Sequence, residues 1–383
     1  MINYFIYFLI FFLTWRSPIH ANPNIVARTA ILVDYHTDKV LFELESEMSI
    51  YPASMTKIMT AIIAFDLLTQ NKMSLDDKIT ISDKAWRMAQ AGYSSMFIMV
   101  DDKISVEDLL KGIIIVSGND ACVALAEGIA GTEENFVTLM NEKAQEIGMT
   151  STQFANSSGI NDPDNYSTVK DIALMSKYLI KNYPNYYEYF KDTEFTWERT
   201  GGDPIVQKNR NLLLFKNLGV DGIKTGHLAV EGYSLASSIK KDTRRLIAVV
   251  SGFKTMRSRN NQSIKLLNWG LTNTQTYEIS KKESTVIEIK TWLGVKKIIK
   301  AYTKEDFYTT IHKKDVKNFN VFLEYSGPVK APIEKDKEIA SIKIYNKDDL
   351  VQIIPVYAVE KLKKVNFLLN LLTSLNYMIW GDA

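Results

Sequence analysis

Two residues near the start of the chain have the types and spacing needed to turn a serine into a nucleophile. Ser54 precedes Lys57 by three positions, so a helix that begins there would place both side chains on one face, one turn apart. A serine hydroxyl attacks at neutral pH only if a base removes its proton, and a lysine serves as that base only if burial or a nearby positive charge keeps it partly neutral. The spacing alone is weak evidence, because serine is also a common helix N-cap.

Two more short motifs strengthen this interpretation. Residues 117–119 (Ser-Gly-Asn) lie between two apolar stretches, where glycine allows a tight turn that leaves two polar side chains pointing outward. Residues 224–226 (Lys-Thr-Gly) begin a strand-like stretch, where Gly226 would let a substrate backbone approach closely. Either motif alone would be an ordinary turn. Together and in this order, the three match the Ser-x-x-Lys, Ser-x-Asn and Lys-Thr-Gly set of penicillin-binding proteins and serine β-lactamases.

Apolar periodicity predicts the elements that position these motifs. Pro52 should open a long helix over residues 55–68, which carries the first motif at its start. The second motif should separate two helices, and the third should lead into strands. The expected elements besides the first helix are two strands within 29–43 that turn at 35–38, strands over 233–239 and 245–251, and helices over 106–116, 121–130, 134–147, 169–181 and 258–270.

The pattern changes from about residue 276 onward. Short strand-like runs alternate there with lysine, aspartate and glycine, which predicts an all-β domain over 276–360 that holds no candidate catalytic group. Residues 361–380 then follow an amphipathic helical pattern, with lysines at its start and a face that includes Phe367 and Leu371. This pattern suits a membrane surface better than a membrane crossing. The alternative is a helix packed on the protein's own core.

The first residues predict an export signal. Residues 4–15 are apolar, which is too few to span a bilayer as a helix but enough for the core of a signal peptide. Ala21 follows at a suitable cleavage distance, so we expect residues 1–21 to be removed. No lysine or arginine precedes the apolar run, which leaves an uncleaved anchor or a buried N-terminal segment as alternatives.

The composition of the 383 residues narrows the class of protein. Hydrophobic residues make up 46% and charged residues 23%, as in a globular protein rather than a disordered one. The net charge of only +2 gives no reason to expect a nucleic-acid partner. Four histidines and one cysteine leave little material for a zinc site, and the apolar surroundings of Cys122 should bury it and make it a poor nucleophile.

Five stretches give the chain its resemblance to a known family. They are residues 52–61 (PASMTKIMTA), 117–127 (SGNDACVALAE), 154–162 (FANSSGIND), 220–236 (VDGIKTGHLAVEGYSLA) and 244–252 (RRLIAVVSG). They resemble the low-molecular-mass penicillin-binding proteins that act as D-alanyl-D-alanine carboxypeptidases, densely so over residues 25–275. The resemblance implies a serine-type hydrolase that removes the terminal D-alanine from peptidoglycan stem pentapeptides through an acyl-enzyme and is inhibited by β-lactams.

The resemblance also implies an α+β fold and a domain order. A signal peptide over 1–21 would precede a β-lactamase/transpeptidase-like catalytic domain over 22–275, in which an antiparallel sheet is packed by helices. A small all-β domain over 276–360 and an amphipathic membrane-anchoring helix over 361–383 would follow. The expected location is the periplasm, with peripheral attachment to the outer face of the inner membrane.

Carried over residue by residue, the resemblance assigns catalytic roles. Ser54 would attack the carbonyl carbon of the penultimate D-alanine, and Lys57 would take its proton. Ser117 and Lys224 would pass a proton to the leaving amine, and Lys224 would also keep Lys57 partly neutral by like-charge repulsion. Asn119 would bond Lys57 and the substrate amide. No metal and no diffusible cofactor are expected.

The substrate-binding residues implied in the same way are Thr225, Gly226, His227 and Arg259. Thr225 and Arg259 would hold the substrate carboxylate, and the main-chain amides of Ser54 and His227 would form the oxyanion hole. For Arg259 the alternative is an exposed basic loop, in which the nearby Arg257 would be equally suitable.

Three other functions compete with the carboxypeptidase. A class A β-lactamase would carry a Glu-x-x-Leu-Asn string between the second and third motifs, and this chain has none. A D,D-endopeptidase that cuts peptide cross-links would use the same three motifs. A non-catalytic cell-wall-binding or scaffold protein would need only the all-β domain and the terminal helix. The expected partners are the stem peptide ending in D-Ala-D-Ala, β-lactam inhibitors and a membrane surface.

Overall fold

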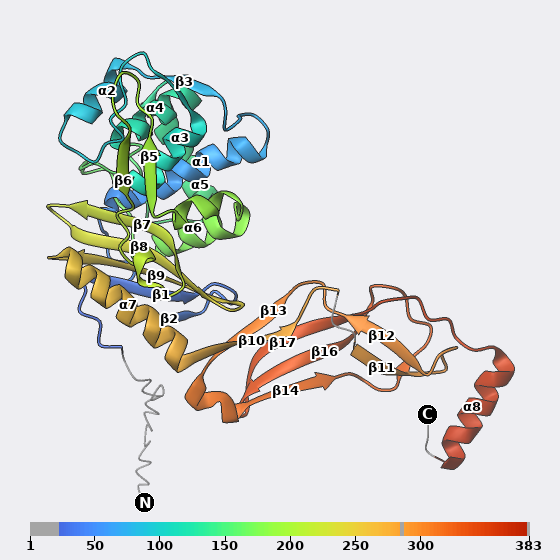
Figure 1. The fold of residues 1–383 in the computed structure, drawn as a ribbon. Helices are drawn as coiled ribbons and strands as arrows, with labels where there is room; N and C mark the ends of the chain where they lie inside the picture. The colour runs from blue at the N-terminus through green and yellow to red at the C-terminus, as the bar shows by residue number, and fades with distance from the viewer. Residues whose placement is uncertain (1–22, 284–286, 381–383) are drawn as a thin grey trace, which may run out of the picture.

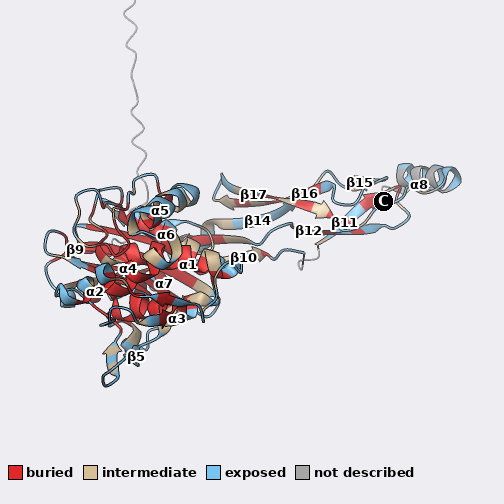
Figure 2. Cartoon of the chain, turned by 90° about the horizontal axis from the view of Figure 1, so that it is seen from above, coloured by how far each residue is buried: buried red, intermediate tan, exposed pale blue. Residues whose placement is uncertain are grey.

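A computed structural model of the chain describes residues 23–283 and 287–380 (Figure 1). Helices and a five-stranded sheet make up residues 23–273, and we call residues 274–365 the β module. Figures 1 and 2 show the β module projecting from the first part, with α8 (Phe367–Trp380) at its far end. The predicted signal peptide, residues 1–21, lies outside the described residues.

The five-stranded sheet is antiparallel throughout and has the order β2-β1-β9-β8-β7. Its strands are β1 (Thr29–Asp34), β2 (Val40–Leu44), β7 (Val220–Leu228), β8 (Gly232–Lys241) and β9 (Arg244–Phe253). β1 lies beside β9, with Ile31 opposite Val249. The sheet therefore pairs strands that are about two hundred residues apart in the sequence. β9 is buried on both faces, which explains why residues 246–250 form a continuous apolar run instead of alternating.

Helices cover both faces of this sheet (Figure 1). α7 (Met256–Asn273) packs on β8 and β9 and buries Leu266 and Leu267 against one face. α1 (Lys57–Thr69) and α6 (Val169–Asn182) lie on the other side. The remaining helices are α2 (Asp83–Gln90), α3 (Val106–Lys111), α4 (Asn119–Ala130) and α5 (Glu133–Ile147). The antiparallel sheet packed by helices that the resemblance implies is therefore confirmed.

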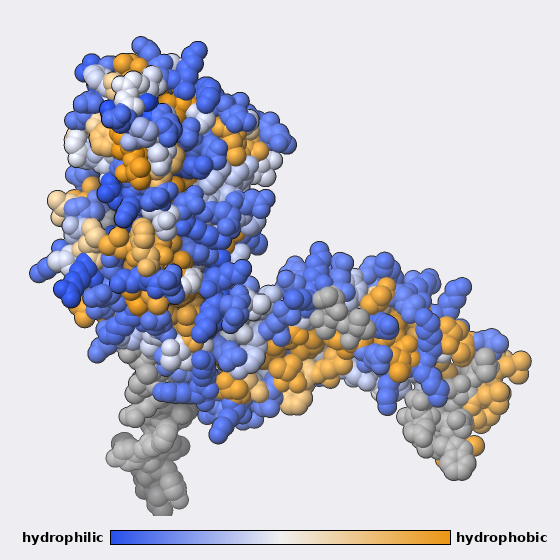
Figure 3. Space-filling view, viewed as in Figure 1, coloured by the Kyte–Doolittle hydropathy of each residue, from blue (hydrophilic) through white to orange (hydrophobic). Residues whose placement is uncertain are grey.

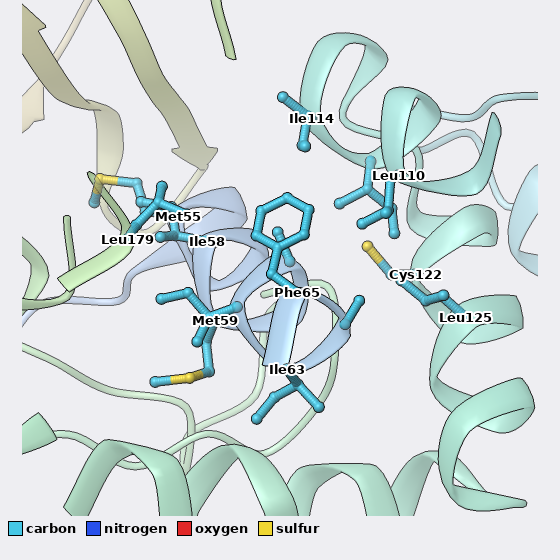
Figure 4. Packing of buried hydrophobic residues seen from close by; sticks show 14 of the residues in the cluster. Met55, Ile58, Met59, Ile63, Phe65, Leu110, Ile114, Cys122, Leu125 and Leu179 are labelled. Atoms are coloured by element: carbon cyan, nitrogen blue, oxygen red, sulfur yellow. The ribbon is translucent and has the colours of Figure 1, made fainter. Parts of the chain in front are cut away.

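The main apolar core surrounds α1, in which ten of the thirteen residues are buried. Figure 4 shows Phe65 of α1 facing Leu110 and Cys122 across the helical layer. Figure 2 shows the same concentration of buried residues around α1 and α4. Burial of Cys122 raises the pKa of its thiol to about 12, so this cysteine stays protonated and inert.

Several short elements were not foreseen from periodicity. Two small antiparallel pairs form, β3 (Lys78–Thr80) with β4 (Lys103–Ser105) and β5 (Glu194–Trp197) with β6 (Ile205–Lys208). Short 3₁₀ turns span Ala53–Thr56, Tyr186–Lys191, Leu214–Lys216 and Lys313–Asn318, and a wider π-type turn spans Gly112–Val116. Runs of three to six residues are too short to give a detectable apolar period.

The β module holds a six-stranded sheet with the order β14-β16-β17-β12-β11-β15 and a separate pair, β10 with β13. Its strands are β10 (Thr274–Ser280), β11 (Ile287–Trp292), β12 (Ile298–Tyr302), β13 (Phe307–His312), β14 (Phe319–Glu324), β15 (Val329–Lys330), β16 (Glu338–Asn346) and β17 (Asp349–Ala358). A core of its own, which includes Ile299, Ile344 and Ile354, is buried between these strands. The prediction that this region consists of β-strands is confirmed.

A polar joint connects the two parts. The buried carboxylate of Asp34, at the end of β1, accepts hydrogen bonds from Arg244 and from the Thr276 hydroxyl of β10. Beside it, Lys39 Nζ donates to the carbonyl oxygen of Thr310 at 2.9 Å, and the Thr37 and Thr310 hydroxyls lie 2.9 Å apart. These bonds tie the turn between β1 and β2 to β10 and β13, so the β module is attached by side chains as well as by the chain itself.

The C-terminal helix α8 exposes its apolar side chains. The large apolar residues exposed on it are Phe367, Leu368, Leu371, Leu372, Leu375, Met378 and Ile379. They form an orange surface at the far end of the β module in Figure 3. Among the described residues, we find no helix with the length and apolar content that a membrane crossing requires.

Candidate active site

Ser54 lies in a tight turn at the start of α1. The 3₁₀ turn Ala53–Thr56 runs directly into α1, so Ser54 lies close to the amino end of the helix. Ala53 has a positive φ of 49°, which turns the backbone sharply just before the serine. The turn is otherwise buried, whereas Ser54 itself is half-buried and reaches a cleft. The apolar residues of α1 fix this turn, because they hold the helix in the core.

Lys57 is buried one helical turn after Ser54, with 1% of its surface exposed. Its ammonium donates to Ser54 Oγ at 3.1 Å, to Asn119 Oδ1 at 2.7 Å and to the carbonyl oxygen of Ser158 at 2.6 Å. Burial lowers the pKa of Lys57, against the opposing effects of Cys122 and Asp120. Of these three oxygens only the Ser54 hydroxyl carries a proton, so a neutral Lys57 is placed to accept that proton.

Ser117 and Asn119 come together at the corner between two helices. The π-type turn that follows α3 ends at Ser117, which takes the left-handed conformation with a φ of 68°. Asn119 then starts α4. This corner directs the Asn119 side chain toward Lys57 and the Ser117 hydroxyl toward β7. The predicted helix over 106–116 is therefore an α-helix that widens over its last turn.

Lys224 of β7 meets Ser117 from the opposite wall. Its ammonium donates to Ser117 Oγ at 2.9 Å. Burial lowers the pKa of Lys224 well below its ordinary value, and the charges of Lys57, Arg210 and Arg259 lower it further. The repulsion between the two buried ammonium groups is mutual, so each lysine disfavours the charged form of the other, and burial is the largest cause for both.

Gly226 and His227 continue β7 past the nucleophile. A Cβ at Gly226 would lie 3.1 Å from the carbonyl oxygen of Pro52 and 3.2 Å from the Cβ of Ala53. Glycine therefore lets β7 pack directly against the turn that carries Ser54. His227 is exposed, and its ring stacks on Tyr233 with the centroids 4.1 Å apart.

Arg259 belongs to α7 and is buried, so it is not part of an exposed loop. Its guanidinium donates to Asn260 Oδ1 at 2.9 and 3.0 Å and borders the cleft near Tyr233. Burial lowers its pKa to about 10. The neighbouring Arg257 does not line this cleft.

One cleft of about 930 Å³ collects these groups. Its lining includes Ser54, Ser117, Asn119, Thr225, Gly226, His227 and Arg259, while Lys57 and Lys224 lie buried behind them. Among the residues that the structure describes, the lining holds cationic side chains and no carboxylate, which suits an anionic ligand.

Sequence reasoning missed several contributors to the site. Tyr93 and Arg210 line the cleft, and Ser158 supplies the carbonyl oxygen that holds Lys57. Ser158 lies inside one of the five resembling stretches, which was a usable signal. Tyr93 and Arg210 lie in segments without apolar periodicity, and only the fold brings them to the site.

Comparison with known proteins agrees with this geometry. A family model described as D-alanyl-D-alanine carboxypeptidase matches residues 17–255, and one described as penicillin-binding protein 5, C-terminal domain, matches residues 275–364. The chain belongs to the D-alanyl-D-alanine carboxypeptidase family. The D-alanyl-D-alanine carboxypeptidase DacC of Escherichia coli is 38% identical over 90% of this chain and 86% of its own length. DacA of Haemophilus influenzae is 36% identical over 85% of this chain and 82% of its own length.

Solved structures extend the match to the whole fold. Penicillin binding protein 5 from Haemophilus influenzae superposes with a TM-score of 0.79 at 33% identity, covering 90% of this chain and all of that one. Penicillin binding protein 6B from Escherichia coli gives 0.74 at 31% identity, covering 88% and 97%. Both alignments include the β module, so the expected order of a catalytic region followed by an all-β region is confirmed. This carboxypeptidase is a hydrolase of the penicillin-binding protein class.

Proposed function

We propose that Ser54 is the acylated nucleophile of this D-alanyl-D-alanine carboxypeptidase and that Lys57 is its general base. The observation that carries the proposal is the 3.1 Å contact between Lys57 Nζ and Ser54 Oγ at a lysine whose pKa burial lowers. A base needs to be neutral before the attack and within hydrogen-bond distance of the proton it takes. Lys57 lies within hydrogen-bond distance of Ser54 Oγ, and burial favours its neutral form.

Acylation then follows as a balanced exchange. Ser54 Oγ bonds to the carbonyl carbon of the penultimate D-alanine, and the Ser54 proton moves to Lys57 Nζ. The bond from that carbon to the leaving amine breaks, and the amine takes the proton of the Ser117 hydroxyl, which Lys224 replaces across their 2.9 Å hydrogen bond. Water then attacks the ester and gives a proton through Ser117 back to Lys224, while Lys57 returns its proton to Ser54 Oγ as the shortened peptide leaves. Asn119 holds Lys57 and the substrate amide during both steps.

The oxyanion and the substrate carboxylate are bound at separate points of the cleft. The main-chain amides of Ser54 and His227 donate to the developing oxyanion, where preorganised donors stabilise the transition state. Thr225 and Arg259 hold the terminal carboxylate, and Gly226 lets the peptide backbone lie along β7. Arg210 adds positive charge at the Ser117 side of the cleft.

The proposed substrate is a peptidoglycan stem peptide ending in D-Ala-D-Ala. β-Lactams would acylate Ser54 in its place, because their cyclic amide resembles the same bond. The D,D-endopeptidase and scaffold alternatives find no support in the comparisons, whose relatives are named carboxypeptidases. We also propose the domain division 1–21, 22–275, 276–360 and 361–383, with the first segment as a cleaved export signal.

The proposed location is the periplasm, at the outer face of the inner membrane. The exposed apolar side chains of α8 follow directly after Lys361, Lys363 and Lys364. Apolar side chains that enter the lipid next to lysines that meet anionic headgroups are typical of a helix lying in a membrane surface.

The deciding experiment is an assay of free D-alanine released from diacyl-Lys-D-Ala-D-Ala by the purified protein. We expect release by the parent and none by Ser54→Ala. A labelled penicillin should modify the peptide that contains Ser54, located by mass spectrometry. A folded parent that releases no D-alanine would overturn the proposed reaction.

A further inference from the structure

A buried carboxylate lies directly behind the active site. Asp120 follows Asn119 in the first turn of α4, and none of its surface is exposed. Its Oδ1 accepts a hydrogen bond from the Met96 amide at 2.9 Å. Its Oδ2 accepts bonds from the Ser95 hydroxyl at 2.7 Å and from the Phe97 and Ile98 amides at 2.8 and 3.3 Å. Four donors from one short segment thus converge on one side chain.

That segment forms part of the active-site wall. The Asn119 amide donates to the carbonyl oxygen of Ser94 at 2.8 Å, and Ser94 lines the cleft together with Gly92 and Tyr93. The Gln207 side chain of β6 donates to the carbonyl oxygen of Ser95 at 3.0 Å. The segment therefore joins the Ser-Gly-Asn corner to β6 on another wall of the cleft.

The corner and the segment fit without spare room. A Cβ at Gly118 would lie 2.8 Å from Asp120 Oδ1 and 3.1 Å from the Met96 amide nitrogen. A Cβ at Gly112, at the start of the π-type turn, would lie 2.4 Å from the Met96 sulfur. The Gly118 contact is with the Met96 backbone, which cannot move aside easily, whereas the Gly112 contact is with the flexible end of the Met96 side chain. The shape of the corner depends on the position of this segment.

We propose that Asp120 is a positioning residue for the acylation step, which acts by holding residues 94–98 against the corner that carries Ser117 and Asn119. This inference rests on the proposed roles of those two residues. Asp120 does not line the cleft. Its four bonds set the direction in which the Asn119 amide oxygen meets Lys57, 2.7 Å away.

Asp120 also affects the charge state of Lys57. Its negative charge raises the pKa of Lys57 against the larger, opposing effect of burial. The other titratable groups that face Lys57 are Cys122 on α4 and Lys224 on β7. Replacing Asp120 by asparagine removes the charge, so Lys57 becomes neutral at lower pH. The acid limb of the acylation rate should then move to lower pH, an effect that a general loss of stability would not produce.

The test compares Asp120→Asn with a matched variant, Asp171→Asn. Asp171 is also a buried carboxylate in the first turn of a helix, where it accepts bonds from the Ser151 amide and the Thr152 hydroxyl, but it lines no part of the cleft. The readouts are the acylation rate by a fluorescent penicillin across pH, D-alanine release, and thermal unfolding. We expect Asp120→Asn to acylate about 100-fold more slowly, since an ångström of misplacement costs about that much. Asp171→Asn should lose stability alone.

Each outcome separates this inference from the proposed function. A parent without D-alanine release contradicts the proposed function. An active parent with a folded Asp120→Asn variant that acylates at the parent's rate and pH overturns the positioning role. If Asp120→Asn does not fold, Ser95→Ala tests the same point, because it removes one of the four bonds. We expect Ser95→Ala to acylate several-fold more slowly at unchanged fold, and parent-like acylation would overturn the proposal.

Discussion

Gly159 provides a sharp test of how the nucleophile is held. It has a φ of +78°, and a Cβ there would lie only 1.8 Å from the carbonyl oxygen of Ala53, the residue before Ser54. To reach 3.0 Å, that oxygen must retreat by about 1.2 Å. The backbone cannot rotate away as a flexible side chain would. The Gly159→Ala substitution should therefore push the nucleophile turn out of position.

Gly131 is a matched control because it has the same φ of +78° and no described atom lies within 4 Å of an added Cβ. Gly131→Ala should show the conformational term alone, about 1 kcal/mol, which corresponds to a fall of about 2–4 °C in Tm. Gly159→Ala carries the same term and the collision with Ala53. We expect its acylation rate to fall about 100-fold, as for a nucleophile displaced by roughly an ångström.

The assay is acylation by a fluorescent penicillin, with thermal unfolding measured in parallel. The reasoning is refuted if Gly159→Ala and Gly131→Ala acylate at the same rate. It is also refuted if Gly131→Ala is the slower of the two, since its added methyl group meets no described atom.

Three further predictions concern the base, the carboxylate site and the terminal helix. The acylation rate should rise with pH as Lys57 loses its proton, with a midpoint below 10.5 because burial lowers this pKa; a midpoint at or above that value, in a pH-rate profile, would count against Lys57 as the base. Arg259→Gln should lower kcat/KM for a peptide with a free terminal carboxylate about tenfold or more and leave an amidated peptide unaffected; equal losses for both would place Arg259 outside the carboxylate site. A chain that ends at residue 365 should release D-alanine but no longer cosediment with anionic phospholipid vesicles, and unchanged cosedimentation would remove α8 from the proposed attachment.

Much of the fold and the chemistry could be predicted because the signals are local. Ser54 and Lys57 lie three residues apart on one helix, so their contact follows from helical geometry alone. The change from helical to strand-like sequence pattern near residue 276 agrees closely with the start of β10 at Thr274. The longer helices have enough turns to reveal their apolar faces.

The remaining parts of the site depend on contacts between distant segments. Ser158 meets Lys57 across about a hundred residues of sequence, and Arg210 reaches the cleft from an irregular connection. Gly226 lines the cleft and also packs against Pro52 and Ala53, neighbours that only the tertiary packing brings to it. Asp120 is buried because residues 94–98, which are distant in sequence, cover it.

The polar joint between β1–β2 and β13 restricts the distance between the cleft and the terminal helix α8. Because Thr37 and Lys39 form hydrogen bonds with Thr310, rotation of the catalytic region relative to the β module is restricted. If α8 lies on a membrane as proposed, the cleft would be held at a fixed distance from the membrane surface. Only the peptidoglycan stem peptides at that distance would then be trimmed. Lengthening the β module would move the trimmed layer outward without any change to the chemistry.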